Sequence, residues 1–473
     1  MTDFLYGALL LFIVILFFNI IIFVHELGHY LAAKWRGLQI DRFQIWFGKP
    51  IWKKTINGVQ YGLGWIPAGG FVALPQMVTM EAIEGENQTT GEQPLPAVKP
   101  IDKVIVAAAG PLFSLLLAFL VALVVWKVGK PQDAITNTVI GAVVEGSPAA
   151  EAGLQAGDRI LAVDGEPVKW FRGDFKAVTE RIMLTKNDQV TFEIERDGKV
   201  MEVVSNFGIS ETKWYQRKAL PQVGIAPAGP VRIGAILETS TPGPAQRAGL
   251  EVGDVILSAN GEQILSGLRL TQILKDNGTQ AISLTVKRGE ETLKKMLTPL
   301  IPEGTYYDRP MIGIQFDSSG LIEATRVYPN PVAQIGDSLK QMWITLSSVA
   351  SPKSKVGLDQ LAGPVGIAHM KFQLLLMEDG WSRLLFLLVL FNVNLAVLNL
   401  LPFPVLDGGH IVMALTEMVR GRPLDPRVLA SVQSLFVLVL LGFFLFVTSK
   451  DLGALVPGQD GPGKAPEIVW PSE

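Results

Sequence analysis

The sequence contains no cysteine and only four histidines in a chain of 473 residues. Without cysteine there are no disulfides and no thiolate ligands, so a metal site has to use His, Asp or Glu side chains. Charged residues make up 18% of the chain, below the usual quarter or so, and a net charge of -3 gives no basic surplus for nucleic-acid binding. The mean hydropathy of +0.33 is instead high for a wholly soluble protein.

Four stretches are apolar and long enough to cross a bilayer, which takes about 20 residues. We expect the transmembrane helices within 1–34, 103–128, 382–410 and 428–449. The first stretch has no basic residues before it and is too long for a secretory signal peptide. The predicted fold is therefore a multi-pass α-helical membrane protein with four transmembrane helices.

Lysine and arginine predict the orientation of these helices. Basic residues gather between the first and second stretches and between the third and fourth. They are Lys34, Arg36, Arg42, Lys49, Lys53, Lys54, Lys99 and Lys103 in the former and Arg420, Arg422 and Arg427 in the latter. By the positive-inside rule both segments face the cytoplasm, so 35–102 is a cytoplasmic-side loop and the large region from 130 to 380 lies on the outer side.

A five-residue motif, His25-Glu26-Leu27-Gly28-His29, ends the first apolar stretch. Residues four apart share a helix face, so His25 and His29 can bind one metal ion, and Glu26 can reach a water on that ion. Because histidine is so scarce, the motif would arise by chance on the order of once in a thousand such chains. Ionisable groups at membrane depth are costly and usually functional, so the motif indicates a metalloprotease whose zinc lies inside the bilayer.

A third protein ligand is expected, because a catalytic zinc uses three and keeps one position open. Asp407 is the preferred candidate. It follows the third apolar stretch, where Pro402 and Pro404 break the helix and two glycines allow a tight turn. This position puts the carboxylate on the same cytoplasmic-leaning side of the membrane as His29. His410 is a competing candidate for the same role.

The segment 35–102 begins with a strand pattern. Residues 38–75 contain three short runs rich in aromatic and β-branched residues, and Asn57-Gly58 between the second and third is a strong signal for a two-residue hairpin turn. Because the hairpin follows the histidine motif so closely, we expect a membrane-associated β-element. Residues 79–100 are polar, contain Pro and Gly, and are predicted to form a loop.

The outer region contains a repeat. Residues 148–160 recur as 244–256, which is 96 residues later. This period predicts one small domain per copy, at 135–222 and 223–303. The shared pattern, AGL-x-x-GD-x-I followed by [DN]G, resembles a PDZ domain, which binds an extended peptide or a free carboxyl terminus by strand addition. Packing modules with blocked grooves are the alternative.

Two further segments accompany the third and fourth stretches. Residues 330–350 begin with Asn330-Pro331, a good helix start, and continue with apolar residues at three- and four-residue spacing. This amphipathic helix is expected either on the bilayer surface or against the second repeat. Residues 450–473 are rich in Pro and Gly and are predicted to be a flexible tail.

The HExxH motif, the N-x-x-P-x-P-x-L-D-G motif at 399–408 and the tandem PDZ-like repeats together resemble the site-2 protease family, of the bacterial regulator-of-sigma-E protease type. The resemblance covers nearly the whole chain. It implies an intramembrane zinc metalloprotease of the bacterial inner membrane, with periplasmic PDZ domains and an active site towards the cytoplasm. The implied substrate is a single-pass transmembrane protein of anti-sigma-factor type, trimmed before it is cleaved, in regulated intramembrane proteolysis and envelope stress signalling.

The same resemblance implies roles for single residues. It implies that Glu26 is the general base and that His25, His29 and Asp407 are the zinc ligands. It also implies that Asn394 and Asn399 bind the substrate. One departure is visible in the second apolar stretch, where members of the family often carry asparagine and this chain has Ser114. A serine hydroxyl also donates and accepts hydrogen bonds.

Two other classes of function fit part of the pattern. A catalytically inactive membrane adaptor would use the PDZ-like pair for binding, but the intact HExxH motif and Asp407 argue against it. A metal transporter would use His and Asp within the membrane as a permeation path, but Glu26 and the large outer region favour a protease. Metal analysis of the purified chain tests the first alternative, and zinc uptake into vesicles tests the second.

Overall fold

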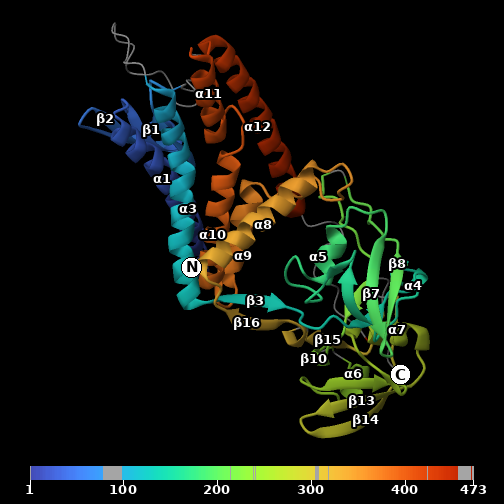
Figure 1. Cartoon of the computed structure of the whole chain (residues 1–473). Coiled ribbons are helices and arrows are strands. Elements are labelled where there is room, and N and C mark those ends of the chain that lie inside the picture. The colour runs from blue at the N-terminus through green and yellow to red at the C-terminus, as the bar shows by residue number, and fades with distance from the viewer. Residues whose placement is uncertain are drawn as a thin grey trace. The chain divides into compact units, whose positions relative to one another are not determined.

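A computed structural model describes residues 2–77, 98–213, 215–237, 239, 241–303, 308–317, 319–422, 424–455 and 470 (Figure 1). The chain divides into two compact units. The first unit comprises 1–131, 326–347 and 361–452, and the second comprises 132–325, 348–360 and 453–473. Most of the loop predicted at 79–100 and most of the tail predicted at 450–473 lie outside the described residues.

The first unit contains the membrane-length helices. Among its described residues, four helices are apolar and long enough to cross a membrane: α1 (Thr2–Arg36), α3 (Pro100–Val128), α10 (Gly380–Asn399) and α12 (Pro426–Leu455) (Figure 1). They fall on the four predicted stretches. The stretch predicted at 382–410 is divided, however, because α10 ends before the two prolines and α11 (Asp407–Arg420) begins after them.

α12 continues past its predicted end at 449. A polar side chain in the added turn, Asp451, has hydrogen-bond partners in another helix. The carboxylate of Asp451 accepts hydrogen bonds from the backbone N–H groups of Gly363 and Gly366, at 3.3 and 2.8 Å. These glycines begin α9 (Pro364–Leu376), a helix that the sequence pattern did not predict. A carboxylate from one helix thus caps the positive N-terminal end of another.

α1 and α3 approach each other closely because small residues line their contact. A Cβ atom on Gly28 of α1 would lie 2.5 Å from the carbonyl oxygen of Ala109 on α3. Farther along α3, the buried Ala118 belongs to a cluster with Val389 of α10. Membrane helices commonly associate through such small residues, because the surrounding lipid provides no hydrophobic force between helices.

The predicted amphipathic helix at 330–350 is α8 (Pro331–Ala350). Asn330 caps it, since its side-chain oxygen accepts the N–H of Ala333 at 2.8 Å. Gln334 is buried and donates to the carbonyl oxygen of Ala122 at 2.9 Å, so α8 packs on α3 of the first unit. The side chain of Trp343 is 72% exposed, as an apolar face turned towards a bilayer would be.

The predicted β-element is present, and it is folded on itself. β1 (Arg42–Ile56) and β2 (Val59–Ala73) form an antiparallel hairpin around Asn57-Gly58, which both have positive φ as in a type I′ turn. Residues 42–45 of β1 pair with the start of β2 and also with residues 70–73 at its end. Because this sheet has no further strand among the described residues, residues 70–73 form an outer edge.

The second unit contains the two predicted repeats, with the same order of elements in each. The first repeat consists of β4 (Ile140–Val143), α4 (Pro148–Glu151), β5 (Arg159–Val163), β6 (Glu166–Pro167), α5 (Val178–Met183), β7 (Val190–Arg196), β8 (Lys199–Ser205) and β9 (Ile225–Pro227). The second consists of β10 (Val231–Ile236), α6 (Pro244–Arg247), β11 (Val255–Ala259), β12 (Glu262–Gln263), α7 (Gly267–Asn277), β13 (Ile282–Arg288), β14 (Glu291–Leu297) and β15 (Ile314–Asp317). Each repeat has its own hydrophobic core.

The last strand of each repeat lies beyond the predicted domain end. β9 pairs with β4 and β15 pairs with β10, so the repeats extend to 227 and 317 instead of 222 and 303. These strands have three and four residues, too few to show a periodic pattern in the sequence. The remaining elements are the paired strands β3 (Lys130–Ala134) and β16 (Glu323–Val327) and two short 3-10 turns at Ser319–Leu321 and Leu358–Gln360.

Both repeats contain the same ion pair. The buried Asp158 and Asp254 accept hydrogen bonds from Arg196 and Arg288, at 2.6 and 2.8 Å. Hydrogen bonding to the Arg288 guanidinium holds the pKa of Asp254 below its usual range. Its contribution to the stability of the second repeat is therefore fully present above the ordinary aspartate pKa of about 4 and is lost as the pH falls through the lowered value.

Candidate metal centre

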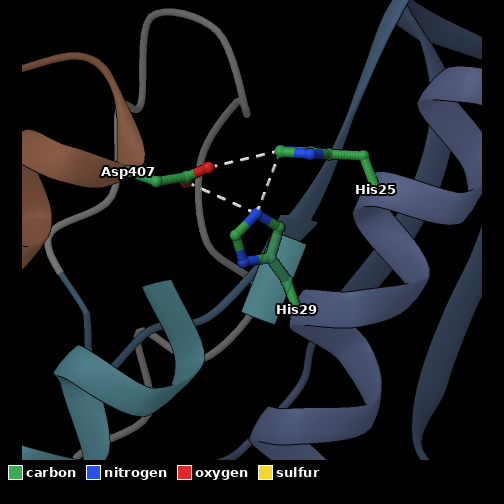
Figure 2. Close-up of side chains that lie close together, drawn as sticks. All are labelled: His25, His29 and Asp407. Atoms are coloured by element: carbon green, nitrogen blue, oxygen red, sulfur yellow. Dashed lines mark hydrogen bonds and ion pairs between the residues drawn. The ribbon is translucent and has the colours of Figure 1, made fainter. Parts of the chain in front are cut away.

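The three predicted ligands come together in the first unit. α1 carries His25 and His29 one turn apart, and Asp407, at the start of α11, points towards both (Figure 2). The Nε2 atoms of the histidines are 3.3 Å apart and lie 3.2 and 3.4 Å from the two carboxylate oxygens of Asp407. A tetrahedral zinc with ligands at about 2.1 Å separates them by about 3.4 Å, so the spacing fits one zinc ion.

The hydrogen bonds of the imidazoles also fit a metal. Nδ1 of His29 lies 2.8 Å from the carbonyl oxygen of Val106, which can only accept, so Nδ1 carries the proton. Nδ1 of His25 lies 3.0 Å from the hydroxyl of Ser114. With the proton on Nδ1, a neutral His29 ring directs the Nε2 lone pair at the carboxylate of Asp407. A cation between these two acceptors would relieve their repulsion.

Backbone packing sets the position of Asp407. Gly408 and Gly409 follow it, and a Cβ atom on either would collide with backbone carbonyl groups of Leu400 and Phe403. Only glycine therefore lets the first turn of α11 lie this close to the loop that leaves α10. The sequence predicts a tight turn at these glycines, and the close approach of backbone explains why the turn needs them.

One face of α3 holds the two histidines in place. Val106, Gly110 and Ser114 are four residues apart and therefore share a face of the helix. Val106 and Ser114 contribute the hydrogen bonds to Nδ1 of the two histidines. A Cβ atom on Gly110 would lie 2.9 Å from Cε1 of His25 and still closer to His29. Sequence reasoning noted Ser114 but missed the other two, although their four-residue spacing was the available signal.

Replacing Gly110 with alanine should lower zinc affinity about 10- to 100-fold, the usual cost of disturbing residues that orient ligands. The added methyl group would occupy the space of both imidazoles. Elemental analysis of the purified variant at limiting zinc measures the effect. Gly7→Ala, also in a membrane-length helix, is the matched control, because nothing lies within 4 Å of its added Cβ. Normal zinc affinity in the Gly110 variant would contradict this geometry.

A cavity of about 610 Å³ adjoins the three ligands. Glu26, Asn399 and His410 line it, together with residues of the β2 edge and an apolar face of α12. Glu26 lies close to the strand, since a Cβ atom on Gly70 would be 3.2 Å from its Cγ. The cavity thus combines a carboxylate able to act as base, a group of side chains able to bind a metal and a strand edge that pairs with no further strand among the described residues.

The two predicted substrate-binding asparagines differ in position. The amide nitrogen of Asn399 lies 3.0 Å from Nε2 of His25, so this side chain reaches the metal-binding group. Asn394 is not among the residues that line the cavity, and its buried amide oxygen has no hydrogen-bond partner among the described residues. The competing candidate His410 lines the cavity but does not belong to the converging group of ligands found in the described chain.

The family and the relatives that this chain matches are zinc metalloproteases, and that is the class of this chain, whose described residues include four membrane-length helices. The chain belongs to Peptidase family M50, whose family model matches residues 12–443.

Relatives match over nearly their whole length. The chain is 28% identical to "Regulator of sigma-E protease RseP" of Escherichia coli (strain K12), over 90% of this chain and 95% of the relative. It is 30% identical to "Protease RseP" of Yersinia pestis over the same shares of both chains. Among solved structures, a PDZ domain of an SdrC-like protein from Listeria monocytogenes is 18% identical and covers 20% of this chain and 93% of that one, with a TM-score of 0.16.

Proposed function

We propose that this chain cleaves the membrane-spanning segment of a single-pass membrane protein that another protease has already trimmed. The substrate would be of anti-sigma-factor type, and the process regulated intramembrane proteolysis in envelope stress signalling at the bacterial inner membrane. The observation that carries the proposal is the group of His25, His29 and Asp407 at a cavity inside a unit of membrane-length helices. The names of the relatives, regulators of sigma-E protease, support the class of substrate.

We assign His25, His29 and Asp407 as the zinc ligands and Glu26 as the general base. A zinc ion held by these residues would supply an activated water and polarise the carbonyl group of the scissile peptide. Glu26 would accept the proton of the water and pass it to the leaving nitrogen. The ring hydrogen bonds to Ser114 and Val106 keep the histidines oriented through this exchange.

The cavity also offers partners for an unwound substrate. A helical segment hides its carbonyl groups in backbone hydrogen bonds, and once it unwinds in lipid these groups need new partners. Residues 70–73 form a strand edge at the cavity wall, which can pair with an extended peptide. We propose that this edge and the amides of Asn399 and Asn394 hold the substrate.

We further propose that the two repeats are PDZ domains on the periplasmic side and that the metal group leans towards the cytoplasm. The repeated order of strands and helices supports the domain assignment. Lys34 and Arg36 in the last turn of α1, one to two turns beyond His29, support the orientation. The β-element that follows them would then lie at the cytoplasmic face of the membrane.

The purified full chain, reconstituted in lipid vesicles with a trimmed single-pass protein, should cut that protein within its membrane span. A zinc chelator should stop the cut, and added zinc should restore it, because the activated water depends on the ion. Product mass locates the cleaved bond. Zinc-loaded chain that leaves every such protein intact would contradict the proposal, and zinc flux into the vesicles without cleavage would favour a transporter.

Replacing Asn399 with alanine should leave zinc content normal and reduce cleavage about 10- to 100-fold, the value of one hydrogen bond to a polarised group. The same change at Asn394, which is not at the cavity wall, should have a smaller effect. Initial cleavage rates and zinc per chain are the two measurements. Loss of zinc from the Asn399 variant would instead mean that this amide orients His25, which it approaches in the structure.

A further inference from the structure

The second unit buries a side chain from the C-terminal segment. Trp470 is 1% exposed, although it belongs to the Pro- and Gly-rich segment 450–473. Its indole lies against two glycines of the second repeat. A Cβ atom on Gly243 would lie 2.6 Å from Nε1 of Trp470, and one on Gly313 would lie 2.9 Å from Cζ2. A larger residue at either position would collide with the indole.

The first repeat has a serine where the second has this space. Ser147 is equivalent to Gly243, which follows it by 96 residues. Gly224 is equivalent to Gly313, since each directly precedes the last strand of its repeat. A Cβ atom on Gly224 would lie 2.6 Å from the hydroxyl oxygen of Ser147. In the first repeat, the side chain of Ser147 therefore lies beside Gly224. In the second repeat, the indole of Trp470 takes the equivalent place beside Gly313.

The exchange of serine for glycine also changes the start of the following helix. In the first repeat, the Ser147 hydroxyl accepts the N–H of Ala150 at 3.3 Å and caps α4. In the second, Gly243 has no side chain for this role, and its own N–H donates to the side chain of Gln246 at 2.9 Å. The second repeat thus lacks the serine cap and has a socket, formed by Gly243 and Gly313, in which the indole of Trp470 lies.

The socket adjoins the last strand of a sheet. In the sheet of the second repeat, the order β14-β13-β11-β10-β15 puts β15 last, and no strand pairs with its outer edge among the described residues. Gly313 directly precedes β15. Peptides that add a strand to such an edge gain affinity from backbone hydrogen bonds and specificity from pockets for their side chains. The socket is such a pocket, at the beginning of the edge.

The indole does not satisfy all of its polar groups in this position. Nε1 of Trp470 is buried and has no hydrogen-bond partner among the described residues. A buried N–H without an acceptor weakens the interaction that holds it. Nothing in the described residues therefore ties the indole by a hydrogen bond, and it lies in contact with the two glycines.

We propose that the second repeat has a binding socket for an indole side chain and that the chain's own Trp470 occupies it. Trp470 thereby acts as an intramolecular ligand that excludes tryptophan-bearing peptides from the β15 edge. This inference concerns binding and does not depend on the proposed protease activity. The first repeat, with Ser147 in the equivalent place, has no such socket.

The test uses a fluorescent peptide with the sequence of residues 464–473 and the full-length chain in detergent. Trp470→Ala chain should bind the peptide, and wild-type chain should bind it at least tenfold more weakly, because its own segment competes. A peptide with alanine in place of tryptophan should not bind. Gly243→Ser in the Trp470→Ala chain fills the socket with the residue of the first repeat and should abolish binding. Ser147→Gly in the same chain is the matched control and should not change it.

Each other outcome overturns the proposal. Equal binding to wild type and Trp470→Ala would mean that Trp470 does not occupy the site. Binding that survives Gly243→Ser, in a variant with the thermal unfolding of its parent, would mean that the glycine socket is not the site. A tethered ligand acts at an effective concentration of about 1 mM, so a segment docked in the intact chain must also bind as a free peptide below that concentration. No binding to Trp470→Ala chain up to about 1 mM would therefore also reject it.

Discussion

Glu26→Gln should retain zinc and fold but lose cleavage, by about a hundredfold to ten thousandfold, which is the usual contribution of a general base. Glutamine keeps the shape of the side chain in the cavity but cannot take a proton from water. Initial rates of cleavage in vesicles, together with zinc per chain, measure the effect. Unchanged zinc is expected because Glu26 is not one of the converging ligands.

Glu417→Gln is the matched control for this experiment. Glu417 is also a carboxylate of the first unit, but it pairs with Lys103 at 2.8 Å and does not line the cavity. The control variant should cleave at close to the wild-type rate. If Glu26→Gln does so as well, another group is the base, and His410 at the cavity wall becomes the first to test.

His25→Ala and Asp407→Ala should each lower zinc affinity by at least about 100-fold, more than the loss of a residue that only orients a ligand. Each change removes one of three atoms that converge within 4.8 Å. Wild-type chain should contain about one zinc, and cleavage should fall together with zinc content. His369→Ala, which alters a histidine outside this group, should keep both. Full zinc in both ligand variants would refute the ligand assignment.

Much of the site could be predicted because it depends on local spacing. His25 and His29 lie four residues apart in one apolar helix, so their shared face follows from helix geometry alone. Pro402 and Pro404 predict the break in the helix before Asp407, but not that a new helix, α11, begins at this residue. The hairpin turn at Asn57-Gly58 is equally local, because these residue types favour positive φ.

The rest depends on contacts between distant segments. Gly110 matters because α1 packs against α3 in one register, and no pattern within α3 specifies that register. The doubled pairing of residues 42–45 requires β2 to curl back, which short strand runs do not indicate. Asn394 and Asn399 look alike in sequence, but only the packing of α10 decides which of them reaches the cavity.

The ligand group joins the beginning of the first unit to its last part. α1 would contribute two ligands and α11 the third. Among the described residues, the chain between them holds both repeats and four helices of this unit, α3, α8, α9 and α10. With no cysteine, the chain cannot tie these segments by a disulfide. On the proposed ligand set, an ion can be held only after α11 has been synthesised and has docked against α1. Under this assignment, a nascent chain that lacks α11 has no complete zinc site, and proteolysis cannot begin before α11 has joined α1.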